Sequence, residues 1–143
     1  MAKKFLGIHI IAELHGCDPV LLDDEKYITD ILLQAAKDTK VTVVDYVTRK
    51  FDPQGVSVVI IVSESHIAIH TWPELRYAAL DFYTCGEEDP ESAVREVAEK
   101  LGTKDFVLFR AERGNVRKIR NINSKIKEIG DADKRSEQIQ ILL

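Results

Sequence analysis

The sequence predicts an α/β (α+β) fold, a two-layer sandwich in which a largely antiparallel sheet carries two main helices on one face. Three observations lead to this prediction. Segments rich in β-branched residues alternate with only two helical segments, in the order strand, helix, several strands, helix, strand. Tight turns join the central strands, which favours antiparallel neighbours. The 143 residues, 45% of them hydrophobic, suffice for a single domain with its own core.

The first strand and the first helix are expected before residue 40. The strand runs from Phe5 to Leu14, where most residues are apolar and branched or aromatic. The helix runs from Pro19 to Lys37, because Asp18 and Pro19 have the chemistry of a helix start. Its apolar residues recur at helical spacing: Ile28, Ile31, Leu32, Ala35 and Ala36.

Four strands are expected in the centre of the chain. β-branched residues return from Lys40 to Phe51 and from Val56 to Val62, and the intervening Asp52-Pro53-Gln54-Gly55 predicts a four-residue hairpin loop. A further extended pair follows at Ser65 to Trp72 and Tyr77 to Thr84. These strands form the antiparallel part of the sheet.

A second helix and a last strand close the domain. Asp89-Pro90 repeats the helix-start chemistry, and a helix is predicted over Pro90 to Leu101. Its apolar positions again repeat at three and four: Ala93, Val94, Val97, Ala98 and Leu101. Lys104 to Arg110 is the closing strand. With both helices on one face, the other face is left to water or to a second copy. Because Val56 to Val62 is apolar on both parities, we expect dimerisation through the sheets.

The segment from about Arg113 onward differs in composition. Nine Lys or Arg residues lie between Arg110 and Arg135. The sequence therefore divides into one domain, residues 1–114, and a polar, basic C-terminal tail, residues 115–143. A mobile, solvated tail is the interpretation we favour. A short amphipathic helix is the alternative, because four isoleucines recur at helical spacing: Ile119, Ile122, Ile126 and Ile129.

Charge and composition exclude several classes of partner. The formal charge is −4, so no overall cationic surface indicates a nucleic-acid or membrane partner. The apolar runs are too short to cross a bilayer. Glu13 and His15 interrupt the apolar N-terminal run, which makes it a poor signal peptide. Two cysteines without an export signal favour free thiols in a reducing compartment, so we expect a cytoplasmic protein.

Chemically reactive residues are concentrated between Ser63 and Glu74 and in Thr84-Cys85-Gly86. His66 and His70 are four residues apart, as in helical zinc motifs, but this segment is predicted to be a strand. On a strand they stand about 13 Å apart at about 3.3 Å per residue, too far for one ion with bonds of about 2 Å. We therefore expect no metal.

Cys85 admits three interpretations from residue chemistry alone. In the first interpretation Cys85 is the nucleophile of a cysteine hydrolase, with His70 as base and Glu74 as orienting group. Alternatively it is an acid or base, or a small buried structural side chain. The spacing of these residues does not decide among the three.

A longer pattern resembles a known family. The run SESHIAIHTWPE with the preceding QGVS and the following DFYTCG, and LGIHIIAELHGCD near the N-terminus, are similar to the prokaryotic pyruvoyl-dependent S-adenosylmethionine decarboxylases. The resemblance covers about Leu6 to Gly114. It implies a self-processing decarboxylase that converts S-adenosylmethionine into the decarboxylated aminopropyl donor and CO2 for spermidine biosynthesis.

The resemblance implies that the proenzyme cleaves itself between Glu64 and Ser65 into a β chain, residues 1–64, and an α chain, residues 65–143. The Ser65 hydroxyl would attack the carbonyl of Glu64 in an N-to-O acyl shift, and Ser57 would hydrogen-bond the intermediate. His70 would remove the α-proton of residue 65, leaving a pyruvoyl group there. Such a ketone forms a Schiff base with the substrate amine and accepts the electrons of the broken bond.

The remaining site residues follow from the same resemblance. Cys85 would return a proton to the substrate α-carbon. Phe51 and Trp72 would stack on adenine, and Glu74 would hold the ribose hydroxyls; core packing is the alternative for the aromatic pair. Three further residues belong to the resemblance without a role that we can derive: His9, Glu13 and His66.

The resemblance also implies a homodimer of processed αβ units with active sites at the subunit interface, so that Phe51 serves a neighbour's pocket. Two alternatives remain. A pyruvoyl-dependent arginine decarboxylase making agmatine would share Ser65, His70 and Cys85 and differ in the pocket. A non-catalytic self-associating α/β module would keep one intact chain.

Overall fold

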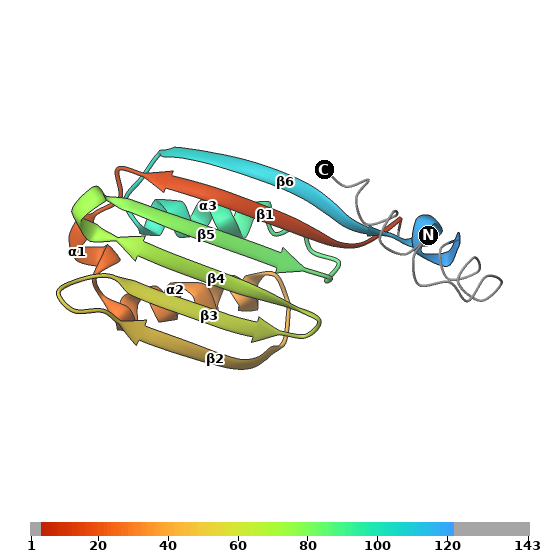
Figure 1. Ribbon diagram of the computed structural model, residues 1–143, viewed down its shortest axis with the longest axis horizontal. Helices are drawn as coiled ribbons and strands as arrows, with labels where there is room; N and C mark the ends of the chain where they lie inside the picture. Colours follow the sequence, from red (N-terminus) through yellow and green to blue (C-terminus); the bar gives the residue numbers. More distant parts are fainter. Residues whose placement is uncertain (1–3, 122–143) are drawn as a thin grey trace, which may run out of the picture. The chain divides into compact units, whose positions relative to one another are not determined.

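A computed structural model describes residues 4–121 of this chain (Figure 1). Within that range six strands form one antiparallel sheet in the order β2-β3-β4-β5-β1-β6. The elements in chain order are β1 (Phe5–His15), α1 (Pro19–Leu22), α2 (Glu25–Asp38), β2 (Val43–Lys50), β3 (Val56–Val62), β4 (Ser65–Trp72), the 3-10 helix η1 (Pro73–Leu75), β5 (Tyr77–Thr84), α3 (Glu91–Lys100) and β6 (Asp105–Asn115). The predicted α+β sandwich is confirmed.

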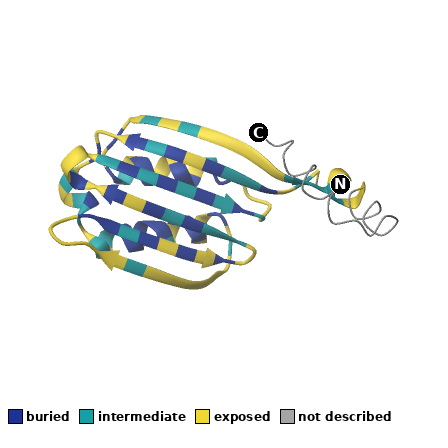
Figure 2. Ribbon diagram, in the orientation of Figure 1, coloured by how far each residue is buried: buried dark blue, intermediate teal, exposed yellow. Residues whose placement is uncertain are grey.

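The two long helices, α2 and α3, lie on the same side of the sheet (Figure 1). Alternate strand residues face them and are buried, as β3 shows with Val56, Val58, Ile60 and Val62 at 0–1% exposure. The intervening residues point to the other side, and Figure 2 shows this alternation along the strands. We call that side the open face. Exposed apolar side chains lie on it, including Val59, Ile61 and Ile11.

The prediction of a single first helix was wrong, because the structure has two. Asp18 caps α1 by accepting the amide of Val20, as the sequence indicated. The helix ends at Asp23, and Asp24 caps α2 by accepting the amide of Tyr27. Two adjacent aspartates each favour a cap over a helix interior, so the chain breaks between them. The break leaves the Asp23 carboxylate available for contacts outside the helix.

The other boundaries lie close to their predicted positions. The strands β3, β4 and β5 coincide with prediction, and β2 is shorter at both ends. The last strand is longer than predicted: β6 continues past Arg110 to Asn115. The tail beyond Asn121, including most of the isoleucine pattern, lies outside the described residues.

The chain divides into two compact units. Gly7–Arg113 forms the larger one and contains all the residues of the site discussed below. The other unit consists of residues 1–6 and 114–143; within it the Val116 amide donates to the carbonyl of Lys4 at 3.0 Å. Among the described residues no helix is long and apolar enough to span a membrane.

Candidate active site

A tight turn joins β3 to β4 at the peptide bond that is expected to break. Val62 pairs with Ser65 across the hairpin, so only Ser63 and Glu64 form the turn. Glu64 has a φ of 72°, in the left-handed region that a residue with a side chain rarely adopts. Such a conformation stores roughly 1–3 kcal/mol of strain and often marks a functional site. The bond between Glu64 and Ser65, where cleavage is expected, thus directly follows a residue with strained backbone.

The Cys85 thiol lies beside that bond. Its Sγ is 3.8 Å from the carbonyl oxygen of Glu64, to which it donates, and 4.0 Å from the Oγ of Ser65. Cys85 follows directly after β5, the strand that pairs with β4. We call Glu64, Ser65 and Cys85 the cleavage-end group. In this group the thiol contacts both the Ser65 hydroxyl and the Glu64 carbonyl.

Ser57 and His70 form a second pair. They lie directly opposite each other in the β3–β4 ladder, and the Ser57 Oγ is 2.7 Å from Nδ1 of His70. This pairing follows from the strand register alone. Two residues to which the resemblance assigns separate processing roles thus lie together, but at a different place from the cleavage-end group.

The distance along β4 separates the two groups. His70 is five residues beyond Ser65 on a continuous strand, so their backbones stand about 16 Å apart at about 3.3 Å per residue. A hydrogen bond or proton transfer requires about 3 Å. Within one chain His70 therefore serves neither Ser65 nor Cys85, and the cysteine hydrolase interpretation, which pairs His70 with Cys85, loses its base.

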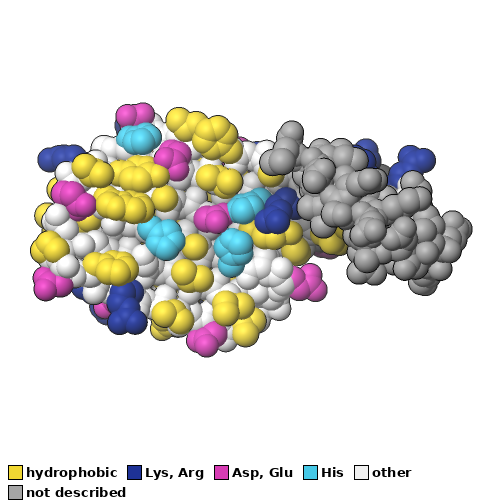
Figure 3. Space-filling model, in the orientation of Figure 1, with side chains coloured by type: hydrophobic (Ala, Val, Ile, Leu, Met, Phe, Trp, Pro, Cys, Tyr) yellow, Lys and Arg dark blue, Asp and Glu magenta, His cyan; other side chains and the backbone are white. Residues whose placement is uncertain are grey.

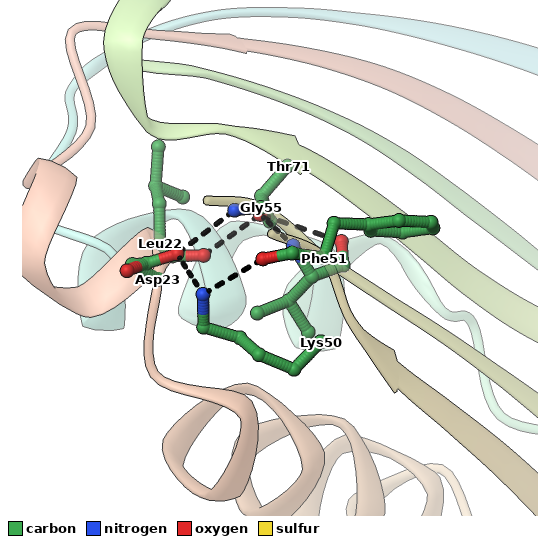
Figure 4. Close-up of polar contacts among 7 residues, drawn as sticks. Leu22, Asp23, Lys50, Phe51, Gly55 and Thr71 are labelled. Atoms are coloured by element: carbon green, nitrogen blue, oxygen red, sulfur yellow. Dashed lines mark hydrogen bonds and ion pairs between the residues drawn. The ribbon is translucent and has the colours of Figure 1, made fainter. Parts of the chain in front are cut away.

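Phe51 lies in the loop between β2 and β3, and a set of polar contacts holds this loop against α1 (Figure 4). The Asp23 carboxylate accepts from the amide of Gly55 and from Nζ of Lys50, both at 2.8 Å. Lys50 also donates to the carbonyl of Phe51 at 3.2 Å. Asp23, at the break between α1 and α2, therefore anchors the loop that carries Phe51.

Thr71 fixes the other side of the same loop. Its hydroxyl donates to the carbonyl of Leu22 at 2.7 Å and accepts from the amide of Val56 at 2.9 Å (Figure 4). Gly55 has a φ of 108°, and a Cβ there would lie 3.1 Å from the carbonyl oxygen of Thr71. Only glycine meets both conditions. The loop is therefore held next to the end of β4, whose last residue is Trp72.

Trp72 and Glu74 lie at this same end of the sheet. The Trp72 ring is half-exposed and stacks on Tyr77 with centroids 5.3 Å apart. Tyr77 donates to Glu13 at 2.6 Å, and burial together with this bond raises the pKa of Tyr77 to about 12. Glu74 lines a cavity of about 790 Å³ with Asp23, Lys50 and Gln54. We call Phe51, Ser57, His70, Trp72 and Glu74 the binding-end group.

Residues that the sequence interpretation did not use lie next to the cleavage-end group on the open face. They are His9, Asp81, Tyr83 and Arg113, together with His66. Figure 3 shows histidines and an acidic group close together on this face. The signal was present in the sequence: Leu80 to Tyr83 alternates apolar and polar residues, which puts Asp81 and Tyr83 on the side opposite to the buried Leu80 and Phe82.

The two cysteines differ in environment. Cys17 is fully buried, and burial raises its thiol pKa to about 11, as for an inert core residue. Cys85 is partly exposed and contacts the turn. Of the two thiols, only that of Cys85 is accessible to a reactant.

Comparisons with known proteins show the family of this chain. The family model described as S-adenosylmethionine decarboxylase matches residues 8–114. The chain is 46% identical over 110 residues to the S-adenosylmethionine decarboxylase proenzyme of Clostridium tetani, covering 76% of this chain and 87% of that protein. The corresponding proenzyme of Caldanaerobacter subterraneus subsp. tengcongensis is 47% identical, with 76% and 89% covered.

The chain belongs to the S-adenosylmethionine decarboxylase family. A solved structure supports this: the adenosylmethionine decarboxylase from Aquifex aeolicus matches with a TM-score of 0.74 and 36% identity, over 80% of this chain and 95% of that one. The family predicted from the sequence is therefore confirmed. The roles of individual residues stay predictions.

A mutation at Asp23 tests how the loop of this decarboxylase is held. The pKa of Asp23 lies below its ordinary 3.8, first because of the hydrogen bond from Lys50 and then because of the Gly55 amide. A lowered pKa means that the ionised carboxylate stabilises the fold above pH 4 or so and loses this effect as the pH falls below that value. Asp23→Ala should lower the free energy of unfolding by about 1 kcal/mol at pH 7, since the groups are partly exposed.

Urea unfolding at pH 7 and pH 3 measures this effect, and the difference from wild type should shrink at pH 3. Hydrogen exchange at the Gly55 amide should accelerate in the same variant. Asp30→Ala, which removes a comparable exposed pair with Lys26, is the control and should leave exchange at Gly55 unchanged. Unchanged exchange in Asp23→Ala would show that Asp23 does not anchor the loop.

Proposed function

We propose that this chain is a self-processing, pyruvoyl-dependent decarboxylase that converts S-adenosylmethionine into decarboxylated S-adenosylmethionine and CO2 for polyamine biosynthesis. Family membership supports the reaction, and the relatives' description as proenzymes supports processing. The observation that carries the proposal is the cleavage-end group, in which Ser65 and Cys85 contact each other at a left-handed turn. Positive φ alone does not distinguish this turn, since Arg76 in the β4–β5 connection also has it, whereas the contact between Ser65 and Cys85 does.

Processing begins at the Glu64–Ser65 bond. The Ser65 oxygen attacks the carbonyl carbon of Glu64, the C–N bond breaks, and an ester replaces the amide. Because Cys85 already donates to that carbonyl oxygen, it is placed to stabilise the negative charge that develops there. The strained φ of Glu64 is relieved as the peptide bond opens.

In the second step the base that removes the α-proton of residue 65 is the partner's His70, in the dimer proposed below, because the two residues lie too far apart within one chain. The ester C–O bond then breaks, Glu64 leaves as a carboxylate, and hydrolysis with loss of ammonia leaves a ketone at residue 65. Ser57, which is hydrogen-bonded to His70, orients its ring and contacts the intermediate. The chain then consists of a β chain, residues 1–64, and an α chain, residues 65–143.

The residues around Ser65 fit a pyruvoyl group, because its precursor hydroxyl touches the proposed proton donor and no bulky side chain intervenes. This group supplies an electron sink for the pair released with CO2. Cys85 delivers a proton to the substrate α-carbon. Phe51 and Trp72 stack on adenine, Glu74 binds the ribose hydroxyls, and a metal has no part in these steps.

We further propose that two chains form a homodimer through their open faces. The cleavage-end and binding-end groups lie at different points along β4, so neither is sufficient alone. A twofold axis between two open faces exchanges them and brings one chain's Ser65 and Cys85 to the partner's Ser57 and His70. Exposed Val59 and Ile61 supply apolar area for such contact.

The substrate is a small molecule, and the reducing cytoplasm is the proposed location because both cysteines lack disulfides. Arginine is the competing substrate on the same chemistry. The exposed aromatic residues Phe51 and Trp72 favour a nucleoside over a guanidinium.

Release of labelled CO2 separates these substrates. We expect release from carboxyl-labelled S-adenosylmethionine, at least about tenfold faster in kcat/KM than from arginine, because only the nucleoside fills the aromatic sites. Ser65→Ala is the control and should release none. Preference for arginine would establish the alternative enzyme, and no release from either substrate would refute the decarboxylase.

Complementation tests the shared active site. Ser65→Ala and His70→Ala chains should each be inactive alone, because each lacks one half of both sites. Coexpressed, they form mixed dimers with one intact site and one doubly mutated site, which should restore about a quarter of wild-type activity. Ser65→Ala with Cys85→Ala is the matched control; both changes fall in the same group, so the mixture should gain no activity over the Cys85→Ala chain alone. A gain of activity in the control, or none in the test pair, would contradict the arrangement.

A further inference from the structure

Tyr83 lies near the reactive thiol of Cys85, on the same side of Gly7. Burial is the main cause of a raised pKa of Tyr83. The charge of Cys85 and a hydrogen bond between the two side chains raise this pKa further, and Arg113 opposes them. Gly7 allows this close packing: a Cβ at that position would lie 2.6 Å from the Tyr83 ring and 3.0 Å from the Cys85 Sγ. The tyrosine stays protonated and donates to sulfur.

Groups from two other strands hold the Tyr83 ring. His9 is its direct partner in the β1–β5 ladder and stacks on it, with centroids 5.1 Å apart and planes 18° apart. The Arg113 guanidinium lies 4.5 Å from the ring centroid, within cation–π range. His66, the partner in the β4–β5 ladder, meets the ring edge-on at 5.9 Å. Few rotamers are therefore open to Tyr83.

Hydrogen bonds order His9 in turn. Arginine is always a donor, so Arg113 Nη1, 3.2 Å away, donates to Nδ1 of His9. The proton of His9 is therefore on Nε2, which donates to Asp81. His66 Nε2 approaches the other oxygen of the same carboxylate at 3.4 Å. The series Arg113, His9, Asp81, His66 forms a continuous network across four strands.

This network has the residue types of a metal site, since ligand atoms of His9, His66 and Asp81 lie within 4.8 Å of one another. Two observations argue against a metal. The Nε2 of His9 must lose its proton to bind an ion, whereas the bond from Arg113 keeps the proton there. A guanidinium in contact with a ligand also repels a cation. The arrangement satisfies its own charges without an ion.

We propose that Tyr83 is a positioning residue for Cys85: clamped by His9 and Arg113, it holds the thiol where its proton reaches the substrate α-carbon and not the ketone-derived carbon. This rests on the proposed role of Cys85. When Cys85 gives its proton to the substrate carbon, the thiolate keeps the Tyr83 hydroxyl bond. Protonation at the wrong carbon transfers the substrate's amino group to the enzyme and inactivates it. Tyr83 therefore governs fidelity as well as rate.

Tyr83→Phe, which keeps the ring and removes the hydroxyl, tests this inference in the processed enzyme. Both kcat and the number of turnovers before inactivation should fall by about two- to tenfold, the size expected for one lost hydrogen bond, with KM unchanged. Arg113→Gln should lower kcat and the number of turnovers by a smaller factor, because it removes the cation–π contact with the Tyr83 ring but leaves the Tyr83 hydroxyl in place. Tyr27→Phe is the matched control: it also removes a tyrosine hydrogen bond, to the Lys100 carbonyl, and should change neither.

A second measurement is independent of processing and turnover. In the uncleaved Ser65→Ala chain, iodoacetamide should alkylate Cys85 about two- to tenfold more slowly when Tyr83→Phe is added, because the thiolate loses a donor. Tyr27→Phe in the same background should leave the rate unchanged. If Tyr83→Phe matches wild type in turnovers before inactivation and in alkylation, the inference is wrong.

These outcomes are distinct from failure of the proposed function. Loss of fidelity in Cys85→Ala with a normal Tyr83→Phe would reject the role of Tyr83 and keep the decarboxylase. No CO2 release by wild type would reject the decarboxylase itself. Binding of one Zn²⁺ per chain, abolished by His9→Ala, would overturn the hydrogen-bond interpretation of the network.

Discussion

The antiparallel pairing of β4 with β3 and β5 is the constraint on which the site depends. It sets Ser57 opposite His70 on one side and His66 opposite Tyr83 on the other. Because side chains alternate along a strand, a shift of one residue would bury His70 among the helices and expose Ile69. The buried alternate residues of β3, β4 and β5 exclude that shift energetically, since each apolar side chain is worth roughly 1.5–3 kcal/mol when buried. Packing against the helices thus fixes the register of the strands, and this register determines which reactive side chains meet on the open face.

Much of this fold could be predicted from the sequence, because its strands carry strong local signals. Val56–Val62, Ser65–Trp72 and Tyr77–Thr84 matched their predicted limits, each being bounded by turn residues. The break between α1 and α2 was missed because two adjacent aspartates inside an otherwise helical pattern look like solvated positions. Their meaning depends on Lys50 and Gly55, which are distant in sequence.

The site, like the fold, could be predicted from the sequence only in part. A specific motif brought Ser65, His70 and Cys85 to notice, but a list of residues carries no distances. The predicted strand over Ser65–Trp72 already implied that Ser65 and His70 lie far apart in one chain, although this spacing was applied only to His66 and His70. The continuous strand β4 shows it for both pairs. The cluster around Tyr83 depends on pairing between β1, β5 and β4, whose register no local pattern encodes. In the proposed mechanism one thiol serves both stages: Cys85 contacts the Glu64 carbonyl, the proposed target of processing, and is the proposed acid in turnover.

The central claim is that the Glu64–Ser65 bond converts into an internal ketone, and intact-mass analysis of freshly purified wild-type protein tests it most directly. The account predicts two fragments, residues 1–64 and residues 65–143, the second lighter than a hydrolytic fragment by one ammonia and reactive toward a hydrazine. A single unbroken chain, or a second fragment that begins with an ordinary serine, would contradict it.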